Sequence, residues 1–521
     1  MVHMGRRLFY MIIIIAFLLR VWDIDARSLW FDEAVEFWSA NTTIWGLPRT
    51  VLLSYQPPLY TYLLHLWIKI DVSPVWLRFL SVSLSILTIG GAITLSRRLL
   101  GLRGALLTGL ILAISPSEIR YAQEIGEYAL MLFALTWMLN LLEWALRASS
   151  WRLWGIWMVF SVISVYTHYG SIITVISLTL TSLFFSIFVK NWRIVIQQIS
   201  VCLLGFVITL PLFVYFLRQQ IQNLPYNFII PSLSVRELIN FVNWMNDTFL
   251  FPLACWPYSL LPKWIGQLVV SMIFVIGVFI IVRPYLKEGS KIIIGLIIAY
   301  TFYYVFVRTG LYGYGVPGFR YALILSPLFF LTCSAAVEYL LVSRKIILSI
   351  ILLLSICLIS IYSLPNRTVL RITGNESRWL DVREDLREVV KSWSHYRQIG
   401  ELTYVYYGAV PAFQYYLMLY NMDRYPLPPG WFYICWKGEG ESLCSRNGVF
   451  YGEFLRAYSA QEKVLSVRKS LGVMPSRFWI IFSHIYRDED VQIVKGLISH
   501  YKYNVLYFYQ HNGASLYLLG R

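Results

Sequence analysis

The chain has 521 residues, of which 58% are hydrophobic and only 14% are charged, and it carries 20 tryptophans and 37 tyrosines. Soluble globular proteins rarely combine these values, so the composition predicts a protein embedded in a membrane. The net charge is +16, but most of the excess lies in short loops between apolar segments. This distribution excludes nucleic acid as the partner, which is the usual other meaning of a basic balance.

The first two thirds of the chain contain repeated apolar stretches of roughly 16 to 24 residues. A helix that crosses a membrane needs about 20 apolar residues, because the hydrocarbon core is about 30 Å thick. The sequence therefore predicts a polytopic α-helical membrane protein with about eleven transmembrane helices. They are expected at residues 8–22, 75–97, 104–118, 126–147, 153–168, 170–189, 194–217, 264–282, 291–307, 320–342 and 346–363.

Lysine and arginine gather in alternate short loops along this series, beginning with Arg6 and Arg7 before the first predicted span. Cations next to transmembrane helices tend to face the cytoplasm, so the N-terminus is expected there and the chain is expected to be a multi-pass protein of the plasma membrane. The long loops at 23–74 and 218–263, and the segment from 364 onward, then lie outside. The cytoplasmic loops are too short to form a binding site, so the chemistry is expected on the outer face.

One apolar stretch within the first outer loop, residues 57–70, is not counted as a span. It is short and contains Pro57, Pro58, His65 and Lys69. A crossing at this point would also move the next basic loop to the outside. We therefore expect a juxtamembrane helix that lies in the outer interface.

Acidic residues crowd into the same first outer loop. Asp23 and Asp25 form an Asp-x-Asp pattern that can hold a divalent metal, since hard cations prefer carboxylate oxygens; a polar collar that ends the first span is the preferred interpretation of so short a motif. Asp32 and Glu33 stand between aromatic residues, where crowded carboxylates become useful general bases, with a solvated loop as the alternative. Neighbouring residues on a helix point about 100° apart, so these two acids are expected to have different roles.

Arg120, Glu124 and Tyr128 surround the next outer turn. Their spacing of four residues predicts that they share one helical face. Ionisable groups where a span leaves the membrane are functional candidates by default, and a plain salt bridge between the first two residues is the alternative.

Three more candidates lie at later outer boundaries. His168 ends a predicted span and can act as a ligand or donate to a phosphate, with a satisfied interfacial residue as the alternative. Arg308 and Arg320 flank a glycine-rich turn, where a guanidinium can clamp a phosphate through two parallel hydrogen bonds. Interfacial snorkelling of these two arginines is the alternative.

Charged residues become frequent in the segment 364–521. This change predicts a soluble extracytoplasmic α/β domain that follows a transmembrane domain over residues 1–363. Helices are expected at 381–393 and 490–500, strands at 402–407 and 478–482, and a closing hairpin from 505–509 and 515–519. Cys435 and Cys444 lie close together in this segment and are a candidate disulfide pair.

Five short motifs are spread over the chain: Ser-Leu-Trp-Phe-Asp-Glu-Ala at 28–34, Gln-Pro-Pro-Leu-Tyr at 56–60, Arg-Tyr-Ala-Gln-Glu at 120–124, Tyr-Thr-His-Tyr at 166–169 and Arg-Tyr at 320–321. With these motifs the chain resembles the dolichyl-phosphate-mannose-protein mannosyltransferase-like family of the GT-C superfamily of lipid-carrier glycosyltransferases. It departs from the family pattern at two positions. Gln56 stands where a histidine commonly precedes the two prolines, and Gly126 stands where an arginine commonly follows the Gln-Glu pair.

The resemblance implies a GT-C fold and an inverting transfer of a sugar, either a hexose such as mannose or a pentose, from a polyprenyl-phosphate carrier. The expected acceptor is a hydroxyl on a protein, lipid or glycan at the outer face of the membrane. Asp32 would match the carboxylate of the first outer loop that serves as the catalytic base or binds the acceptor, and Glu33 would be its partner. Candidates for binding the donor phosphate or the substrates are Gln56, Tyr60, Arg120, Glu124, Tyr128, His168, Arg308 and Arg320.

This chemistry also fits the residue inventory on independent grounds. The leaving group is already an anionic phosphodiester, so it needs cationic stabilisation and no general acid, whereas the incoming hydroxyl needs a base. The sequence indicates no definite cofactor, and a divalent metal is a candidate, with Asp23 and Asp25 as its ligands. Two alternatives are a transporter or flippase for a lipid-linked substrate, which would need internal repeats and polar groups at mid-membrane, and a non-catalytic membrane assembly subunit.

Overall fold

The computed structural model describes residues 2–54, 56–222, 239–241, 243–244, 274–282, 287–308, 323–343, 345–362, 384–422, 445–446, 448–453, 459–485 and 488–521. The chain divides into two compact units. The first, here called the helical unit, comprises Met1–Trp22, Tyr55–Tyr60 and Arg78–Leu370. The second, here called the sheet unit, comprises Asp23–Ser54, Thr61–Leu77 and Arg371–Arg521.

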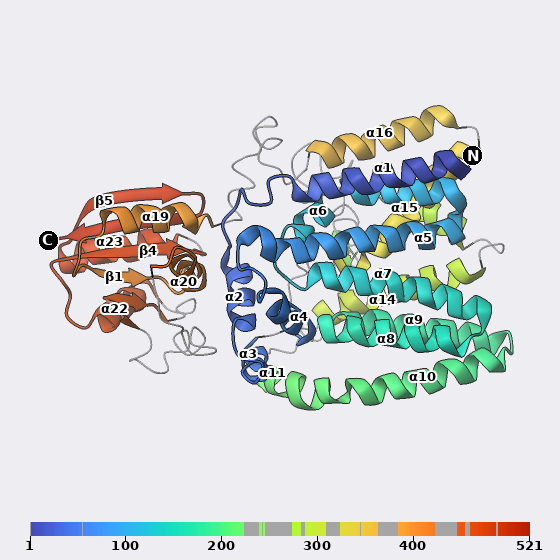
Figure 1. Ribbon diagram of the computed structural model, residues 1–521, viewed down its shortest axis with the longest axis horizontal. Helices are drawn as coiled ribbons and strands as arrows, with labels where there is room; N and C mark the ends of the chain where they lie inside the picture. The colour runs from blue at the N-terminus through green and yellow to red at the C-terminus, as the bar shows by residue number, and fades with distance from the viewer. Residues whose placement is uncertain are drawn as a thin grey trace. The chain divides into compact units, whose positions relative to one another are not determined.

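The helical unit is a bundle whose long helices lie side by side with nearly parallel axes (Figure 1). Its described elements are α1 (Val2–Val21), α5 (Pro74–Ile114), α6 (Pro116–Ala122), α7 (Tyr128–Ala148), α8 (Trp151–Thr167), α9 (Ser171–Phe188), α10 (Trp192–Pro211), the π-helix η1 (Leu212–Leu217), α11 (Arg218–Gln222), α14 (Lys287–Arg308), α15 (Ser326–Val342) and α16 (Ile346–Tyr362).

Within the described part of the chain, six helical stretches are long and apolar enough to cross a membrane: Pro74–Ile114, Tyr128–Ala148, Ser171–Phe188, Trp192–Gln220, Gly289–Phe306 and Leu323–Val342. The helices α8 and α16 are slightly shorter, with 17 residues each. Of the predicted span at 264–282, only residues 274–282 are described. An integral membrane protein is therefore supported by the helices themselves, whereas the number of spans stays a prediction.

The 41-residue helix α5 is in fact two segments joined at Gly101. Gly101 has φ 79°, a left-handed conformation that glycine adopts without a steric penalty. The two segments lie against each other next to this bend, as the hydrogen bond of 2.9 Å from the Thr108 hydroxyl to the Ser96 hydroxyl shows. The two spans predicted at 75–97 and 104–118 are thus separate helical segments with a tight basic turn between them.

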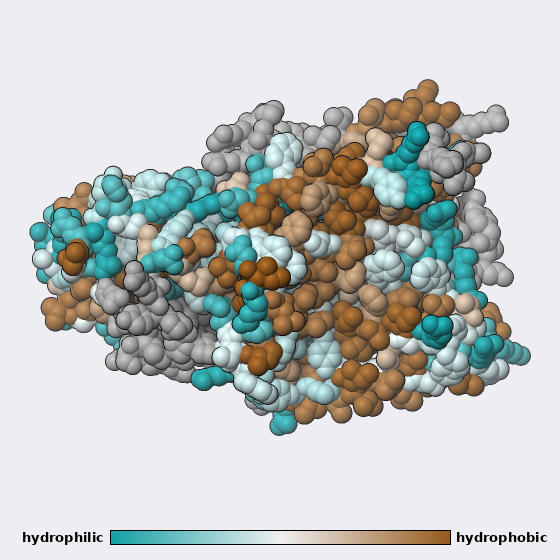
Figure 2. Space-filling view, in the orientation of Figure 1, coloured by the Kyte–Doolittle hydropathy of each residue, from teal (hydrophilic) through white to brown (hydrophobic). Residues whose placement is uncertain are grey.

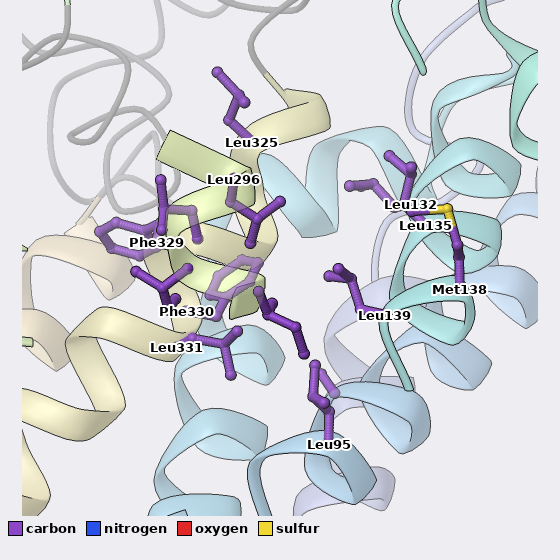
Figure 3. Packing of buried hydrophobic residues seen from close by; sticks show 14 of the residues in the cluster. Leu95, Leu132, Leu135, Met138, Leu139, Leu296, Leu325, Phe329, Phe330 and Leu331 are labelled. Atoms are coloured by element: carbon purple, nitrogen blue, oxygen red, sulfur yellow. The ribbon is translucent and has the colours of Figure 1, made fainter. Parts of the chain in front are cut away.

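The interior of the helical unit is apolar. Figure 3 shows leucines and phenylalanines from several helices converging, among them Leu95 of α5, Leu139 of α7, Leu296 of α14 and Phe330 of α15, all of them buried. The outer surface of the bundle is also hydrophobic: Figure 2 shows a broad brown area over its long helices. Exposed apolar side chains over so wide an area are typical of a surface in contact with lipid.

The sheet unit contains a six-stranded mixed sheet in the order β2-β3-β1-β4-β6-β5. The strand β1 (Leu402–Val405) pairs in parallel with β3 (Val449–Tyr451) and β4 (Arg477–Ser483), and β6 (Ala514–Gly520) pairs antiparallel with β4 and with β5 (Asn504–His511). The short β2 (Ser445–Arg446) pairs antiparallel with β3. These elements confirm the strands predicted at 402–407 and 478–482 and the hairpin predicted from 505–509 and 515–519.

Helices cover both faces of this sheet (Figure 1). Because side chains alternate along a strand, Tyr404, Ile480 and their neighbours pack with α22 (Ala460–Leu471) and α23 (Glu489–Tyr501). Thr403, one residue earlier, faces the other side and accepts a hydrogen bond from Trp393 of α19 (Leu386–Tyr396). Trp393 also contacts Phe413 of α20 (Val410–Leu419), which places α19 and α20 on this second face.

Three helices from the first predicted outer loop belong to the same unit: α2 (Phe31–Ala40), α3 (Leu47–Leu53) and α4 (Leu59–Trp67), the last of which begins in the helical unit. The indole of Trp38 in α2 donates a hydrogen bond of 2.9 Å to the carbonyl of Pro411 in α20. The nine residues of α4 reach about 14 Å, half of what a crossing needs. The stretch 57–70 therefore does not form a helix that spans the membrane, as the sequence predicts.

Candidate active site

Asp32 and Glu33 occupy the first turn of α2 in the sheet unit. The side chain of Glu33 is fully buried, and its Oε2 accepts a hydrogen bond of 3.4 Å from the backbone amide of Trp30. Glu33 thus satisfies one of the amides that a helix leaves without partners at its start. Asp32 is partly exposed. The two neighbouring acids therefore have different surroundings, and Asp32 is the more exposed of the two.

The start of α2 is held by residues from the far end of the sequence. The amide of Leu29 donates a hydrogen bond of 2.7 Å to the hydroxyl of Tyr416, and the amide of Phe31 donates one of 3.1 Å to Oε2 of Glu384. More than 350 residues separate the partners of each bond. The sequence gives no local signal for such contacts, and neither Glu384 nor Tyr416 was a candidate before the structure was known.

A second group of candidates lies in the helical unit, at the end of α6, the start of α7 and the end of α8. Arg120, Glu124, Tyr128 and His168 are all buried there. The prediction that Arg120, Glu124 and Tyr128 share one helical face is wrong, because α6 ends at Ala122 and α7 begins only at Tyr128. Residues 123–127 form turns and bends that include Gly126, and glycine favours such a break. The three side chains thus come from two helices and the turn between them.

The structure brings Tyr128 and His168 together. His168 directly follows α8, and its ring centroid lies 5.8 Å from that of Tyr128 at the start of α7. Tyr128 in turn lies 5.0 Å from the ring of Tyr121, over which the guanidinium carbon of Arg120 lies at 5.6 Å. A row of buried aromatic and cationic groups therefore links the Arg-Tyr-Ala-Gln-Glu motif with the Tyr-Thr-His-Tyr motif.

Gln56 and Tyr60 also lie in the helical unit, where Tyr60 is buried. The carbonyl of Gln56 accepts a hydrogen bond of 3.0 Å from the side chain of Gln220, whose Oε1 accepts one of 2.6 Å from the hydroxyl of Tyr169. Burial raises the pKa of Tyr169, so its hydroxyl stays protonated and remains a donor. The Gln-Pro-Pro motif is thus connected, through Gln220, to the residue next to His168.

The remaining predicted residues lie at the ends of the described segments or outside them. Arg308 is the last residue of α14, and Arg320 lies outside the described residues, as do Cys435 and Cys444. The candidate phosphate clamp and the candidate disulfide therefore stay predictions.

For the candidate metal pair, the structure shows one competing interaction. The guanidinium of Arg387 lies 3.4 Å from Oδ1 of Asp25 and donates a hydrogen bond of 2.9 Å to its carbonyl. Asp23 adopts a left-handed conformation with φ 58°. Among the described residues, no three His, Cys, Asp or Glu side chains are grouped so that they could hold a metal ion. Asp25 thus has a cationic side chain as its neighbour.

Part of the chain matches a known protein family. Residues 55–217 match the model of the family described as dolichyl-phosphate-mannose-protein mannosyltransferase. This range contains the second, third and fourth of the five motifs. We found no significant match among curated protein sequences.

Among solved structures, the chain is similar to ArnT from Cupriavidus metallidurans bound to undecaprenyl phosphate, with a TM-score of 0.55 and 12% identity over 98% of this chain and 97% of that one. The apo state of the same ArnT gives a TM-score of 0.54 at the same identity and coverage. The oligosaccharyltransferase AglB of Archaeoglobus fulgidus, in complex with an inhibitory peptide and a dolichol-phosphate, gives a TM-score of 0.45 at 12% identity over 98% of this chain and 74% of that one.

The similarity to ArnT shows that the two chains share a fold over nearly their whole lengths. The family model matches residues 55–217, which carry three of the five motifs, so this part of the chain is similar to a mannosyltransferase family. The resemblance predicted from the motifs is therefore confirmed over residues 55–217, where the chain is similar to the dolichyl-phosphate-mannose-protein mannosyltransferase family.

Proposed function

We propose that this protein is an inverting glycosyltransferase that moves a sugar from a polyprenyl-phosphate carrier to a hydroxyl acceptor on the outer face of its membrane. The observation that carries the proposal is the family match over residues 55–217 within a chain that shares the fold of ArnT. One ArnT structure is bound to undecaprenyl phosphate, which is a carrier lipid of the proposed kind. The sugar would be mannose or another hexose, or a pentose, and the acceptor a protein, lipid or glycan.

In the proposed reaction, the oxygen of the acceptor hydroxyl attacks the anomeric carbon of the sugar from the side opposite to the phosphate. A new carbon–oxygen bond forms, the bond between that carbon and the phosphate oxygen breaks, and the configuration inverts. Asp32 takes the proton of the hydroxyl, because it is the partly exposed member of the acid pair, while Glu33 accepts a hydrogen bond at the start of the helix. Polyprenyl phosphate leaves as an anion.

Stabilisation of the departing phosphate is assigned to the second group. His168, Tyr128 and Arg120 offer N–H and O–H donors that are buried in the helical unit, and donors in such a site stabilise developing negative charge more strongly than donors in water. Arg308 and Arg320 are proposed as further cationic contacts for the phosphate, and Gln56, Tyr60 and Glu124 as substrate-binding residues. Asp23 and Asp25 stay candidate ligands of a divalent metal.

The proposed topology has about eleven spans, a cytoplasmic N-terminus and an outer sheet unit. A structural relation supports the parity of this count. Leu29 and Phe31 are bonded to Tyr416 and Glu384, so both segments must lie on the same side of the membrane. The chain between them must then cross an even number of times, and the prediction places ten of its spans there.

The test is the release of polyprenyl phosphate from synthetic polyprenyl-phosphate mannose and, in parallel, from a polyprenyl-phosphate pentose, with a membrane extract as the source of acceptor. Asp32→Asn keeps the shape of the side chain but cannot accept a proton, so we expect turnover to fall about 10²-fold or more. Asp488→Asn, at an exposed position before α23, is the matched control and should be as active as the unaltered protein.

Two results would contradict the proposal. Full turnover by Asp32→Asn would remove the assigned base, and Glu33 or Glu124 would then need the same test. If polyprenyl-phosphate mannose or the polyprenyl-phosphate pentose moved across vesicle membranes without release of polyprenyl phosphate, the protein would be a transporter and not a transferase.

A further inference from the structure

Three residues form a closed set of contacts at the start of α2. The carboxylate of Glu384 accepts a hydrogen bond from the Phe31 amide at 3.1 Å through Oε2, and its Oε1 lies 2.6 Å from Nδ1 of His484. The ring of His484 stacks on the ring of Phe31, with centroids 4.5 Å apart and planes at 12°. Phe31, Glu384 and His484 all belong to the sheet unit. The residue before Asp32 is therefore held both by its backbone and by its side chain.

Glu384 is itself fixed by its neighbours in the chain. The hydroxyl of Ser28 donates a hydrogen bond of 2.7 Å to the Glu384 carbonyl and accepts one of 3.1 Å from the amide of Leu386. The next residue, Asp385, donates from its amide to the carbonyl of Asn512 at 2.8 Å. These backbone bonds tie Glu384 to the loop before α2 and to the turn between β5 and β6, so its carboxylate has little freedom.

His484 is held in an unusual backbone conformation. It directly follows β4 and has φ 54°, which is uncommon for a residue other than glycine and persists where the surroundings impose it. The neighbouring segment after β1 approaches it closely, because a Cβ atom added at Gly408 would lie 2.7 Å from the Cβ of His484. His484 thus stands at the carboxyl edge of the two parallel strands β1 and β4, where α/β folds commonly place functional residues.

We propose that Glu384 and His484 are positioning residues for sugar transfer, which orient the first turn of α2 and so aim the carboxylate of Asp32 at the acceptor hydroxyl. This inference rests on the proposed function of Asp32. The physical reason is that the amide of Phe31 is one of the donors at the positive end of α2 that have no acceptor within the helix itself, and Glu384 fixes its direction. Asp32 follows Phe31 in the chain, so a displacement of Phe31 moves Asp32 with it.

Substitutions at the two positions separate the hydrogen bonds from the ring stack. Glu384→Gln keeps the volume of the side chain but removes its negative charge and replaces one of the two oxygens, which contact Phe31 and His484 separately, with an NH2 group that can only donate. His484→Phe keeps a ring on Phe31 and loses the N–H, whereas His484→Ala loses both. Glu388→Gln in the neighbouring α19, where Glu388 forms an exposed pair with Lys391, is the matched control.

The experiment measures kcat and KM for polyprenyl-phosphate mannose, and for the pentose donor, on full-length protein that elutes as a single species. We expect kcat to fall about 10- to 100-fold in Glu384→Gln and His484→Ala, because small misplacements of a reacting group have effects of this size. The kcat of His484→Phe should lie between the values of these two variants and that of the unaltered protein. KM for the donor should stay within about twofold, since neither residue lies in the proposed phosphate site; a loss of folding alone would lower the amount of active protein without changing kcat per folded molecule.

Hydrogen exchange of the amides of residues 29–33 gives a readout that does not depend on turnover. We expect faster exchange in Glu384→Gln and His484→Ala than in Glu388→Gln. If exchange and kcat both stay at the values of the unaltered protein in Glu384→Gln and His484→Phe, the positioning role is overturned. If exchange changes while Asp32→Asn keeps full turnover, Glu384 and His484 still order α2, but the assignment of Asp32 as base has failed.

Discussion

The side-chain amide of Gln123 donates a hydrogen bond of 3.0 Å to the backbone carbonyl of Arg20. Arg20 in turn donates from its guanidinium to the carbonyls of Leu112 and Ala113, each at 3.1 Å. The last four carbonyls of a helix lack partners within that helix. The ends of α1 and α5 are therefore each capped by a side chain from another segment.

Gln123→Ala should destabilise the helical unit without abolishing its fold. The variant loses the bond to Arg20 and a second one, of 2.8 Å, to the carbonyl of Trp22. Leaving such partly buried carbonyls unpaired costs about 1–3 kcal/mol of unfolding free energy, which thermal unfolding in detergent can detect. Gln461→Ala, at an exposed position of α22, is the control and should change the stability by less than about 0.5 kcal/mol. Equal melting temperatures for both variants would contradict the capping role.

Arg20→Met should have a larger effect than Gln123→Ala. The guanidinium of Arg20 is fully buried and also donates to the Ser85 hydroxyl at 2.8 Å, so its removal leaves several acceptors without a donor. We expect a loss of about 3 kcal/mol or more, and Arg20→Lys should recover only part of it because one ammonium cannot reproduce the guanidinium fork. Thermal unfolding followed by tryptophan fluorescence measures this loss. Arg152→Met, at the exposed start of α8, should be nearly neutral, and a similar loss there would show that the effect is not specific.

Breaking a buried ion pair of the sheet unit should cost more unfolding free energy than breaking an exposed ion pair that also involves α22. Nζ of Lys463 in α22 lies 2.6 Å from Oε1 of Glu489 in α23, and the hydroxyl of Tyr406 donates to the other carboxylate oxygen. Lys463→Met leaves the Glu489 carboxylate buried without its cation and should lower the unfolding free energy by about 3–5 kcal/mol. Lys463→Met combined with Glu489→Leu should lower it by less.

The control for this pair is Lys469→Met, which breaks an exposed contact of 3.1 Å with Glu453 and should cost less than about 1 kcal/mol. Hydrogen exchange of α22 and α23 in the full-length chain measures these variants and the single change Glu489→Leu. A double variant that is as unstable as the sum of its single changes would show that Lys463 and Glu489 do not interact.

The sequence predicts local structure better than it predicts which segments meet. Hydrophobic length and spacing give most helices, the bend of α5 and the final hairpin, because these depend on near neighbours in the chain. The spacing of four residues from Arg120 to Tyr128 was misleading, because it continues through a turn that contains Gly126. Contacts such as that between Phe31 and Glu384 join residues 353 positions apart, so hydrophobic periodicity carries no information about them.

The topology can be tested by the labelling of single cysteines in a chain whose six native cysteines are replaced by serine. Trp45 and Val473 are 90% and 87% exposed and both belong to the sheet unit. Trp45→Cys and Val473→Cys should therefore react with a membrane-impermeant thiol reagent from the same side. The positive-inside rule predicts that this side is the outer one.

Arg193→Cys provides the opposite case in the same assay. Arg193 is exposed near the start of α10, next to the turn that contains Lys190, and this turn is among those predicted to face the cytoplasm. It should react only after the membrane is permeabilised. Reaction of Arg193→Cys in intact cells, with protection of the other two, would invert the orientation and move Asp32 to the cytoplasmic side. Opposite labelling of Trp45→Cys and Val473→Cys would instead show an odd number of crossings between them, which is incompatible with the bonds that Leu29 and Phe31 make to Tyr416 and Glu384.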